Sequence, residues 1–139
     1  MVDTSILLRR MATIRHSLSR LASKRGLSRA EFLADPDAQD VVLRHLQVGA
    51  QAALDAALHV IRDAGWELPG TSVGSFEVLA RHGVIDPDLA DRLRLAGQMR
   101  NLLVHVYDAI NLDRVYEAYQ HSAGDLERYC QALVGHFRL

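Results

Sequence analysis

The feature of this sequence that most constrains its fold is a helix start signal that occurs twice, as Asp35-Pro36 and as Asp86-Pro87. An aspartate can cap a helix with its carboxylate, and proline is accepted at the first helical position because its missing N–H would have no partner there. A third start, at Ser28, has the spacing of a capping box. Between these signals apolar residues recur every three or four positions, and no segment alternates as a half-buried strand would. The sequence therefore predicts an all-α protein.

The expected elements are one long helix and several shorter ones. From Pro36 to about Ala64 there is no helix breaker except Gly49, so this helix would be roughly 40 Å long. Its small residues would let another helix approach closely, from the same chain or from a second copy. Further helices are expected over about 7–21 (ended by Gly26), 28–34, 75–82, 87–103 and 112–137, with a loop over 65–74. These elements predict an antiparallel helical bundle of about four to six helices, taken as a single domain over residues 1–139.

Composition narrows the class of protein. With 49% hydrophobic residues the chain can form a sizeable core, and its single cysteine, Cys130, excludes an internal disulfide and a multi-cysteine zinc site. Charged residues interrupt every apolar run before it reaches the roughly 20 residues that a membrane span needs. The first residues also lack the pattern of a signal peptide. We therefore expect a cytoplasmic protein that does not associate with a membrane.

The charge is distributed unevenly along the chain. Residues 1–30 contain six arginines and Lys24 against the single acid Asp3, a local charge of +6, so the remainder carries −7 of the total of −1. A basic first helix of this kind could face phosphate while another surface faces an acidic partner. A solvated helix face balanced by acids elsewhere in the fold explains the same numbers, and the sequence leaves both interpretations open.

The residues that suggest chemistry lie in the run Arg100-Asn101-Leu102-Leu103-Val104-His105-Val106-Tyr107. Arg100 supplies a cation for phosphate, His105 a proton-transfer group near neutral pH, and Tyr107 a hydroxyl. At about 100° per residue Arg100 and Tyr107 would share a helix face, whereas Arg100 and His105 would differ by about 140°. A common site therefore requires that the helix end or distort before His105, or that a second chain complete the site. Asn101 could hydrogen-bond either the imidazole or a substrate phosphate.

This run matches the pattern R-x-x-x-x-H-x-Y, and on it the chain resembles the HepT-like proteins of the HEPN superfamily. The similarity extends over nearly the whole chain and includes Leu8-Arg9-Arg10, residues 27–33, residues 42–48, His82-Gly83-Val84-Ile85 and Val115-Tyr116. The segment before the arginine reads Gly97-Gln98-Met99-Arg100-Asn101, one residue longer than the Gly-Phe-Arg-Asn that is common in the family. This difference bears on how the glycine packs against Arg100.

The resemblance implies a HEPN-like fold and the toxin of a toxin–antitoxin system, a metal-independent endoribonuclease without a cofactor. It also implies a homodimer or higher oligomer in which two motifs face one another across a cleft that binds RNA. His105 would act as general base on the RNA 2′-hydroxyl or as acid for the leaving 5′-oxygen, and Arg100 would stabilise the charge on phosphorus, with Asn101 in support. The implied partner is an MntA-like nucleotidyltransferase antitoxin that transfers AMP from ATP to Tyr107.

Other interpretations remain beside this one. Asp55, His59 and His45 lie on the long helix but form no metal motif, and three of the tyrosines are expected to be core or interface residues and not stacking platforms. No glycine-rich phosphate loop is present, so ATP would be bound by the partner. The main rival function is a non-catalytic binding or regulatory subunit of a two-component nucleotidyltransferase, and a second rival is a plain oligomerisation protein. The near-neutral total charge favours these rivals, because it offers no broad attraction for RNA.

Overall fold

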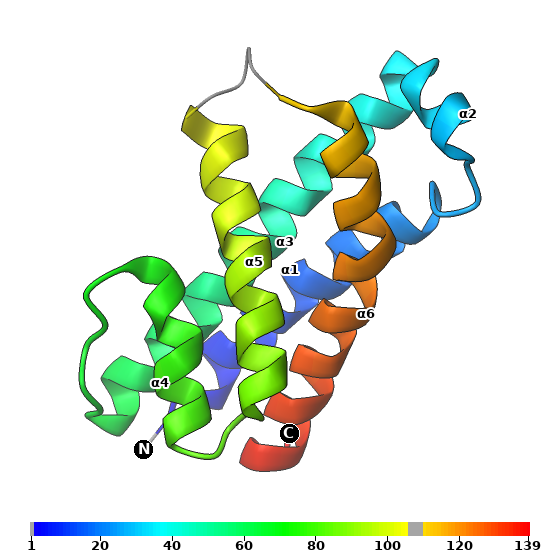
Figure 1. Ribbon diagram of the computed structural model, residues 1–139. Coiled ribbons are helices and arrows are strands. Elements are labelled where there is room, and N and C mark those ends of the chain that lie inside the picture. The colour runs from blue at the N-terminus through cyan, green and yellow to red at the C-terminus, as the bar shows by residue number, and fades with distance from the viewer. Residues whose placement is uncertain (1, 106–109) are drawn as a thin grey trace.

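Figure 1 shows the computed structural model of the chain, which describes residues 2–105 and 110–139, and the side chains of all of these except 103–105. Six α-helices and one short 3-10 helix make up the described part, which contains no β-strand. They are α1 (Thr4–Ala22), α2 (Arg29–Leu33), α3 (Pro36–Ala64), η1 (Ser72–Gly74), α4 (Ser75–Arg81), α5 (Pro87–His105) and α6 (Leu112–Phe137). The predicted all-α bundle is confirmed, and the helix α3 has the predicted bounds.

The helix starts are those that the sequence signals predict. The Asp35 carboxylate accepts from the Ala38 N–H at 3.1 Å, and the Asp86 carboxylate accepts from the Leu89 N–H at 2.7 Å. Ser28 forms the complete capping box, and Asn111 caps α6. Because each cap pairs an N–H group that would otherwise lack a partner, these side chains fix where the helices begin.

One predicted helix end is wrong. α1 stops at Ala22 and not at Gly26, because the Ser23 hydroxyl donates to the Arg20 carbonyl oxygen at 2.6 Å and the next residues form a turn. Short polar side chains of this kind compete with the helix for backbone groups. The end of α3 is different, since Gly65 adopts the left-handed conformation, with φ of 72°, that favours glycine at a helix C-terminus.

The core consists of two groups of buried side chains. The larger group surrounds the alanine-rich half of α3, and side chains of α1, α4, α5 and α6 pack against it. The smaller group lies where α2 meets α3 and α6 and contains Leu21, Phe32, Ala38, Val42, Leu46, Val115 and Tyr119. Both buried tyrosines donate to backbone carbonyl oxygens, Tyr119 to Lys24 and Tyr129 to Ala53. None of the described helices is both long enough and apolar enough to cross a bilayer.

The small residues of α3 are covered by helices of the same chain. A Cβ added at Gly49 would lie 3.3 Å from the Ser17 Cβ of α1 and 3.4 Å from the Leu126 Cδ1 of α6. Figure 1 shows α1 running beside α3 over most of its length, with α6 across both. Of the two alternatives that the sequence left open for these residues, close approach by the same chain is therefore the one observed.

At the C-terminus of α3, the aromatic pair Trp66 and His82 holds the loop that leads to α4. The Trp66 ring stacks on the His82 ring with the centroids 3.9 Å apart and the planes 4° from parallel. Glu67 pairs with Arg81 at 2.9 Å and with the Nε2 of His82 at 3.0 Å, and this contact with His82 lowers the pKa of the Glu67 carboxyl. The loop is thus closed onto the C-terminus of α4 by side chains on either side of it.

The packing at Gly49 gives a stability prediction. Gly49→Leu should destabilise the protein by about 1–3 kcal/mol, because the new side chain has no space between α1 and α6. Gly124→Leu should stabilise it by about 0.5–1 kcal/mol, because that helical glycine has no heavy atom within 4 Å of its Cβ position. Urea titrations of both variants measure the difference. Two variants that change stability in the same direction would contradict the close approach at Gly49.

Candidate functional site

Arg100 lies on the inward face of α5, seven residues after the buried Leu93. Its side chain is half-buried, and its Nη1 donates to the Oδ1 of the neighbouring Asn101 at 2.9 Å. In the part of the chain that the structure describes, the buried Nε of Arg100 has no hydrogen-bond partner. The sequence suggested that Asn101 bonds the imidazole or a substrate phosphate. In the structure its side-chain oxygen instead accepts from the Arg100 guanidinium.

The other two motif residues are described only in part. α5 remains helical up to His105, so the helix does not end before that residue, which removes one of the ways in which one chain could bring Arg100 and His105 together. The side chain of His105 and the whole of Tyr107 lie outside the described residues. Their predicted roles stay predictions.

Gly97 explains how the motif helix approaches its neighbours. A Cβ at this position would lie 2.7 Å from the Val73 Cγ1 of η1, which is closer than side chains tolerate. The glycine therefore allows α5 to pack directly on the 3-10 helix and on Phe76 of α4. Two residues separate Gly97 from Arg100 here, one more than is common in the family. Arg100 therefore lies nearly one helical turn after Gly97 and still on the inward face of α5.

A groove of about 600 Å³ runs between α5 and the N-terminal half of α6. Its apolar wall is provided by α5 and includes Leu95 and Leu102, which are 61% and 50% exposed. Its polar lining comes mostly from α6, with Arg29 of α2 and Arg92 of α5; the α6 residues are Asp113, Arg114, Glu117, His121 and Asp125. Leu102 lies two residues after Arg100, so the groove leads up to the motif.

The groove is lined by an ion pair whose carboxylate is the least exposed of those in the ion pairs of the described residues. Arg92 Nε lies 2.6 Å from Asp125 Oδ1, and the Asp125 side chain is only 11% exposed. The hydrogen bond to Asp125 and the charge of that carboxylate raise the pKa of the Arg92 guanidinium. Arg92 is therefore neutralised, whereas Arg114 at the upper end of the groove has no carboxylate within 4.0 Å among the described side chains.

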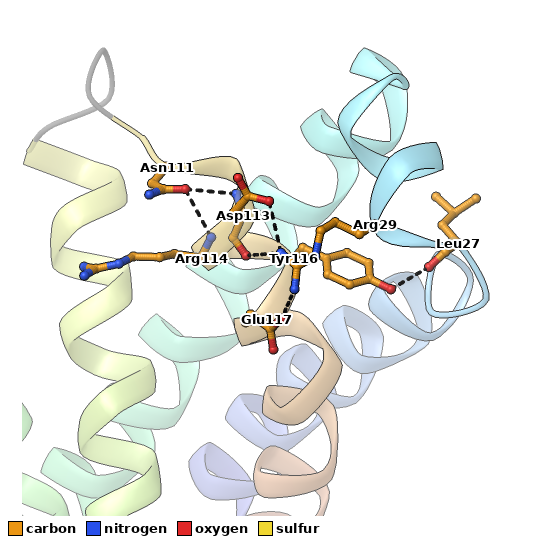
Figure 2. A network of polar contacts seen from close by, with 7 residues as sticks. All are labelled: Leu27, Arg29, Asn111, Asp113, Arg114, Tyr116 and Glu117. Carbon is orange, nitrogen blue, oxygen red and sulfur yellow. Dashed lines mark hydrogen bonds and ion pairs between the residues drawn. The ribbon is translucent and has the colours of Figure 1, made fainter.

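A polar network holds the start of α6 against α2 (Figure 2). Arg29 pairs with Asp113 at 3.0 Å and with Glu117, and its guanidinium carbon lies 4.9 Å from the centre of the Tyr116 ring. The Tyr116 hydroxyl donates to the Leu27 carbonyl oxygen at 3.0 Å. The figure also shows Arg114 extending from the first turn of α6 toward α5. The network therefore positions the first turns of α6.

The residues considered for metal binding have other partners. Asp55 accepts from Gln51 at 2.8 Å and lies 3.9 Å from Arg10, while the Nε2 of His59 lies 2.9 Å from the Asp3 carbonyl oxygen. Within the described side chains, no group of three or more His, Cys, Asp and Glu residues is arranged as a metal site. Sequence reasoning missed the groove and its ion pair, because residues 33 positions apart give no local signal of contact.

Comparison with known proteins gives consistent results. A family model described as ribonuclease HepT-like matches residues 14–133. The chain is 32% identical over 128 residues to an mRNA nuclease HepT of Shewanella oneidensis, covering 92% of this chain and 96% of that protein. It is 27% identical over 117 residues to a tRNA nuclease HepT of Aphanizomenon flos-aquae, covering 84% and 80%.

Solved structures with the same fold include toxin–antitoxin complexes. A tri-AMPylated HEPN toxin of Shewanella oneidensis, in complex with MNT antitoxin, is 31% identical, covers 97% of this chain and 99% of that chain, and has a TM-score of 0.84. A toxin–antitoxin crystal structure with AMP-PNP is 30% identical, covers 94% and 98%, and has a TM-score of 0.86. The HEPN-like fold predicted from the motif is thus confirmed.

The two arginines of the groove give a matched stability prediction. Arg92→Ala should lower the stability of the protein measurably, because it removes the partner of the Asp125 carboxylate, whose side chain is only 11% exposed. Arg114→Ala should change stability by less than about 0.5 kcal/mol, because no described ion pair is lost. Urea titration at neutral pH measures both values. Equal effects of the two substitutions would show that the buried pair is not what stabilises the groove.

Proposed function

The chain belongs to the HepT-like ribonuclease family, and from this membership we propose that it is the toxin of a toxin–antitoxin pair, a metal-independent endoribonuclease acting in the cytoplasm. Its catalytic residues in this proposal are Arg100 and His105, with Asn101 in support. The relatives named mRNA nuclease and tRNA nuclease, together with the complete R-x4-H-x-Y run, support the assignment of RNA as substrate.

The observation that carries the proposal is the state of the Arg100 guanidinium. Asn101 orients it through Nη1, while the buried Nε has no acceptor among the described residues. A buried cationic donor without a partner is costly, so it favours an anionic acceptor that arrives with the substrate. A phosphate oxygen fits this requirement, because the planar guanidinium can donate two parallel hydrogen bonds to it.

In the proposed reaction, RNA supplies its own nucleophile. His105 removes the proton from a 2′-hydroxyl, whose oxygen attacks the adjacent phosphorus, and the bond from phosphorus to the 5′-oxygen breaks. The leaving oxygen takes a proton from an imidazolium, which a second histidine could provide. Arg100 stabilises the negative charge that gathers on the phosphoryl oxygens in the transition state.

We further propose that two copies of the chain form the active unit. α5 is helical through His105, so Arg100 and His105 of one chain diverge by about 140° around the helix, and a second copy can supply the missing group. Leu95 and Leu102 are seven residues apart and thus lie on one stripe of α5, both exposed, beside the groove. Exposed apolar residues aligned in this way favour an interface between copies that ends at the motif.

The proposed partner is a nucleotidyltransferase antitoxin that transfers AMP from ATP to Tyr107. The complexes of related toxins with MNT antitoxin, one of them tri-AMPylated, support this assignment. Tyr107 lies two residues after His105, so an AMP group there would place a phosphodiester and a base next to the catalytic residues. The AMP group would occupy the space that RNA needs, and its phosphate could pair with Arg100 in place of an RNA phosphate.

The first functional prediction concerns cleavage itself. The purified chain should cleave RNA in excess EDTA, and Arg100→Ala and His105→Ala should each lower the rate by about a hundred-fold or more, as loss of acid–base or electrostatic catalysis does. Circular dichroism should show unchanged helix content. Activity that depends on added metal, or that survives loss of His105, would refute the mechanism. Absence of cleavage with intact binding to the partner would favour the non-catalytic subunit.

The second concerns the oligomer. Leu95→Asp and Leu102→Asp should convert the dimer into a monomer and lower cleavage in proportion, because each places a charge in the proposed apolar contact. Leu68→Asp is the control, since Leu68 is 67% exposed but lies in the loop after α3. Analytical ultracentrifugation with a parallel cleavage assay reads both effects. A fully active monomer would contradict the shared site.

The third concerns regulation. Incubation with the nucleotidyltransferase proposed as antitoxin and ATP should add AMP to the wild-type chain and abolish cleavage. Tyr107→Phe should keep its mass and most of its activity. Intact mass and RNA cleavage are measured on the same samples, with Tyr116→Phe as a matched control. If Tyr107→Phe gains the same mass and loses the same activity, Tyr107 is not the acceptor.

A further inference from the structure

A row of basic side chains lies on α1 and α3. We call it the basic stripe, and it consists of Arg9, His16 and Arg20 of α1 with Arg44 and His45 of α3. Positions 9, 16 and 20 are separated by seven and four residues, so they share one face of α1. This face is turned away from the buried Leu7, Met11 and Ile14, and the three arginines of the stripe are exposed.

The two helices bring the stripe together at its upper end. The His16 and His45 rings meet edge to face with centroids 5.6 Å apart, and His45 Nδ1 lies 3.3 Å from the Ser17 hydroxyl. Partial burial lowers the pKa of His45, and the positive charges of His16, Arg20 and Arg44 lower it further. The charges that lower the pKa of His45 are thus those of basic side chains.

The stripe has no acidic partners in the described part of the chain. None of Arg9, Arg20 and Arg44 lies within 4.0 Å of a described carboxylate, and Asp40, one turn before Arg44, forms no ion pair with it. Neighbouring arginines differ in this respect, since Arg10 lies 3.9 Å from Asp55 and Arg29 pairs with two acids of α6. Within residues 1–30, Arg10 of α1 and Arg29 of α2 thus have acidic partners, whereas the arginines of the stripe have none among the described residues.

The α1 part of the stripe lies on a helix that does not border the helix of the proposed catalytic motif. α1 packs against α3 and α6 and makes no contact with α5, the helix that contains Arg100. A ligand along Arg9, His16 and Arg20 would consequently lie on a helix that does not line the groove. The stripe also has no apolar centre, because Leu8 is the only large exposed apolar residue of α1 and is turned about 100° from Arg9.

We infer that the basic stripe binds the phosphodiester backbone of the RNA substrate outside the cleaved segment, without reading its bases. This inference rests on the proposed function, which makes RNA the substrate. From Arg9 to Arg20 the stripe extends for about 16 Å along α1, so it can face several phosphates in succession. Arginine forks bind phosphate oxygens well, and phosphate contacts give affinity and register but no sequence preference. An acidic protein would instead need an apolar centre, which the stripe lacks.

The test measures RNA binding separately from cleavage. The probe is a fluorescein-labelled 20-nucleotide 2′-O-methyl RNA, which lacks the attacking hydroxyl, and its anisotropy is followed between about 50 and 300 mM salt. The stripe variant carries Arg9→Gln, Arg20→Gln and Arg44→Gln. The control variant loses the same charge through Arg62→Gln, Arg94→Gln and Arg138→Gln, all exposed and outside the stripe. Thermal unfolding confirms that both variants are folded.

The stripe variant should bind at least ten-fold more weakly than the wild type at about 100 mM salt, and the slope of log affinity against log salt should fall by about 2, as expected for three lost phosphate contacts. Its cleavage of a dinucleotide should be unchanged, whereas KM for long RNA should rise. The control variant should match the wild type.

Three results would overturn the inference: equal slopes for the wild type and the stripe variant, equal losses in both variants, or loss of nucleotidyltransferase binding with RNA binding intact. If the wild type binds RNA through the stripe but cleaves none, the proposed function fails while the stripe stands.

Discussion

The close packing of α3 against α1 and α6 at Gly49 determines where the remaining elements lie. Because a Cβ at this position would lie only 3.3 Å from Ser17 and 3.4 Å from Leu126, the three helices pack closely here, and α3 also packs against α4 and α5. α5 then packs against the far side of α3 and presents Arg100 inward. Arg100, the residue proposed to be catalytic, thus lies on a helix that packs on the same central helix as α1 and α6.

Helix starts could be predicted from the sequence because each depends on residues within one turn. Asp35, Asp86 and the Ser28 capping box act through hydrogen bonds between residues three positions apart. The end of α1 was predicted wrongly because Ser23 competes with the helix for a carbonyl oxygen, and that outcome depends on side-chain geometry. The partners of Gly49 depend on how helices far apart in sequence are arranged, so periodicity alone left them open.

The same distinction applies to the site. The motif could be recognised because its residues form one local run. The hydrogen bond of Asn101 to Arg100 could not be predicted, because the Asn101 side chain can also bond other groups. The excess of positive charge over residues 1–30 could also be counted from the sequence, but not which of its arginines form ion pairs. Ion pairs to Asp55, Asp113 and Glu117 are formed across helices, and only the folded chain separates the paired arginines from those of the basic stripe.

The stack of Trp66 on His82 has a consequence for how unfolding of this protein can be observed. Trp66 is the only tryptophan of the chain, so its fluorescence reports a single place, the junction between the end of α3 and the end of α4. Circular dichroism reports all helices together. If the two signals change at the same denaturant concentration, the α4 end and the rest of the bundle unfold as one cooperative unit. Earlier loss of the fluorescence signal would instead identify the α4 end as a separate unit of lower stability.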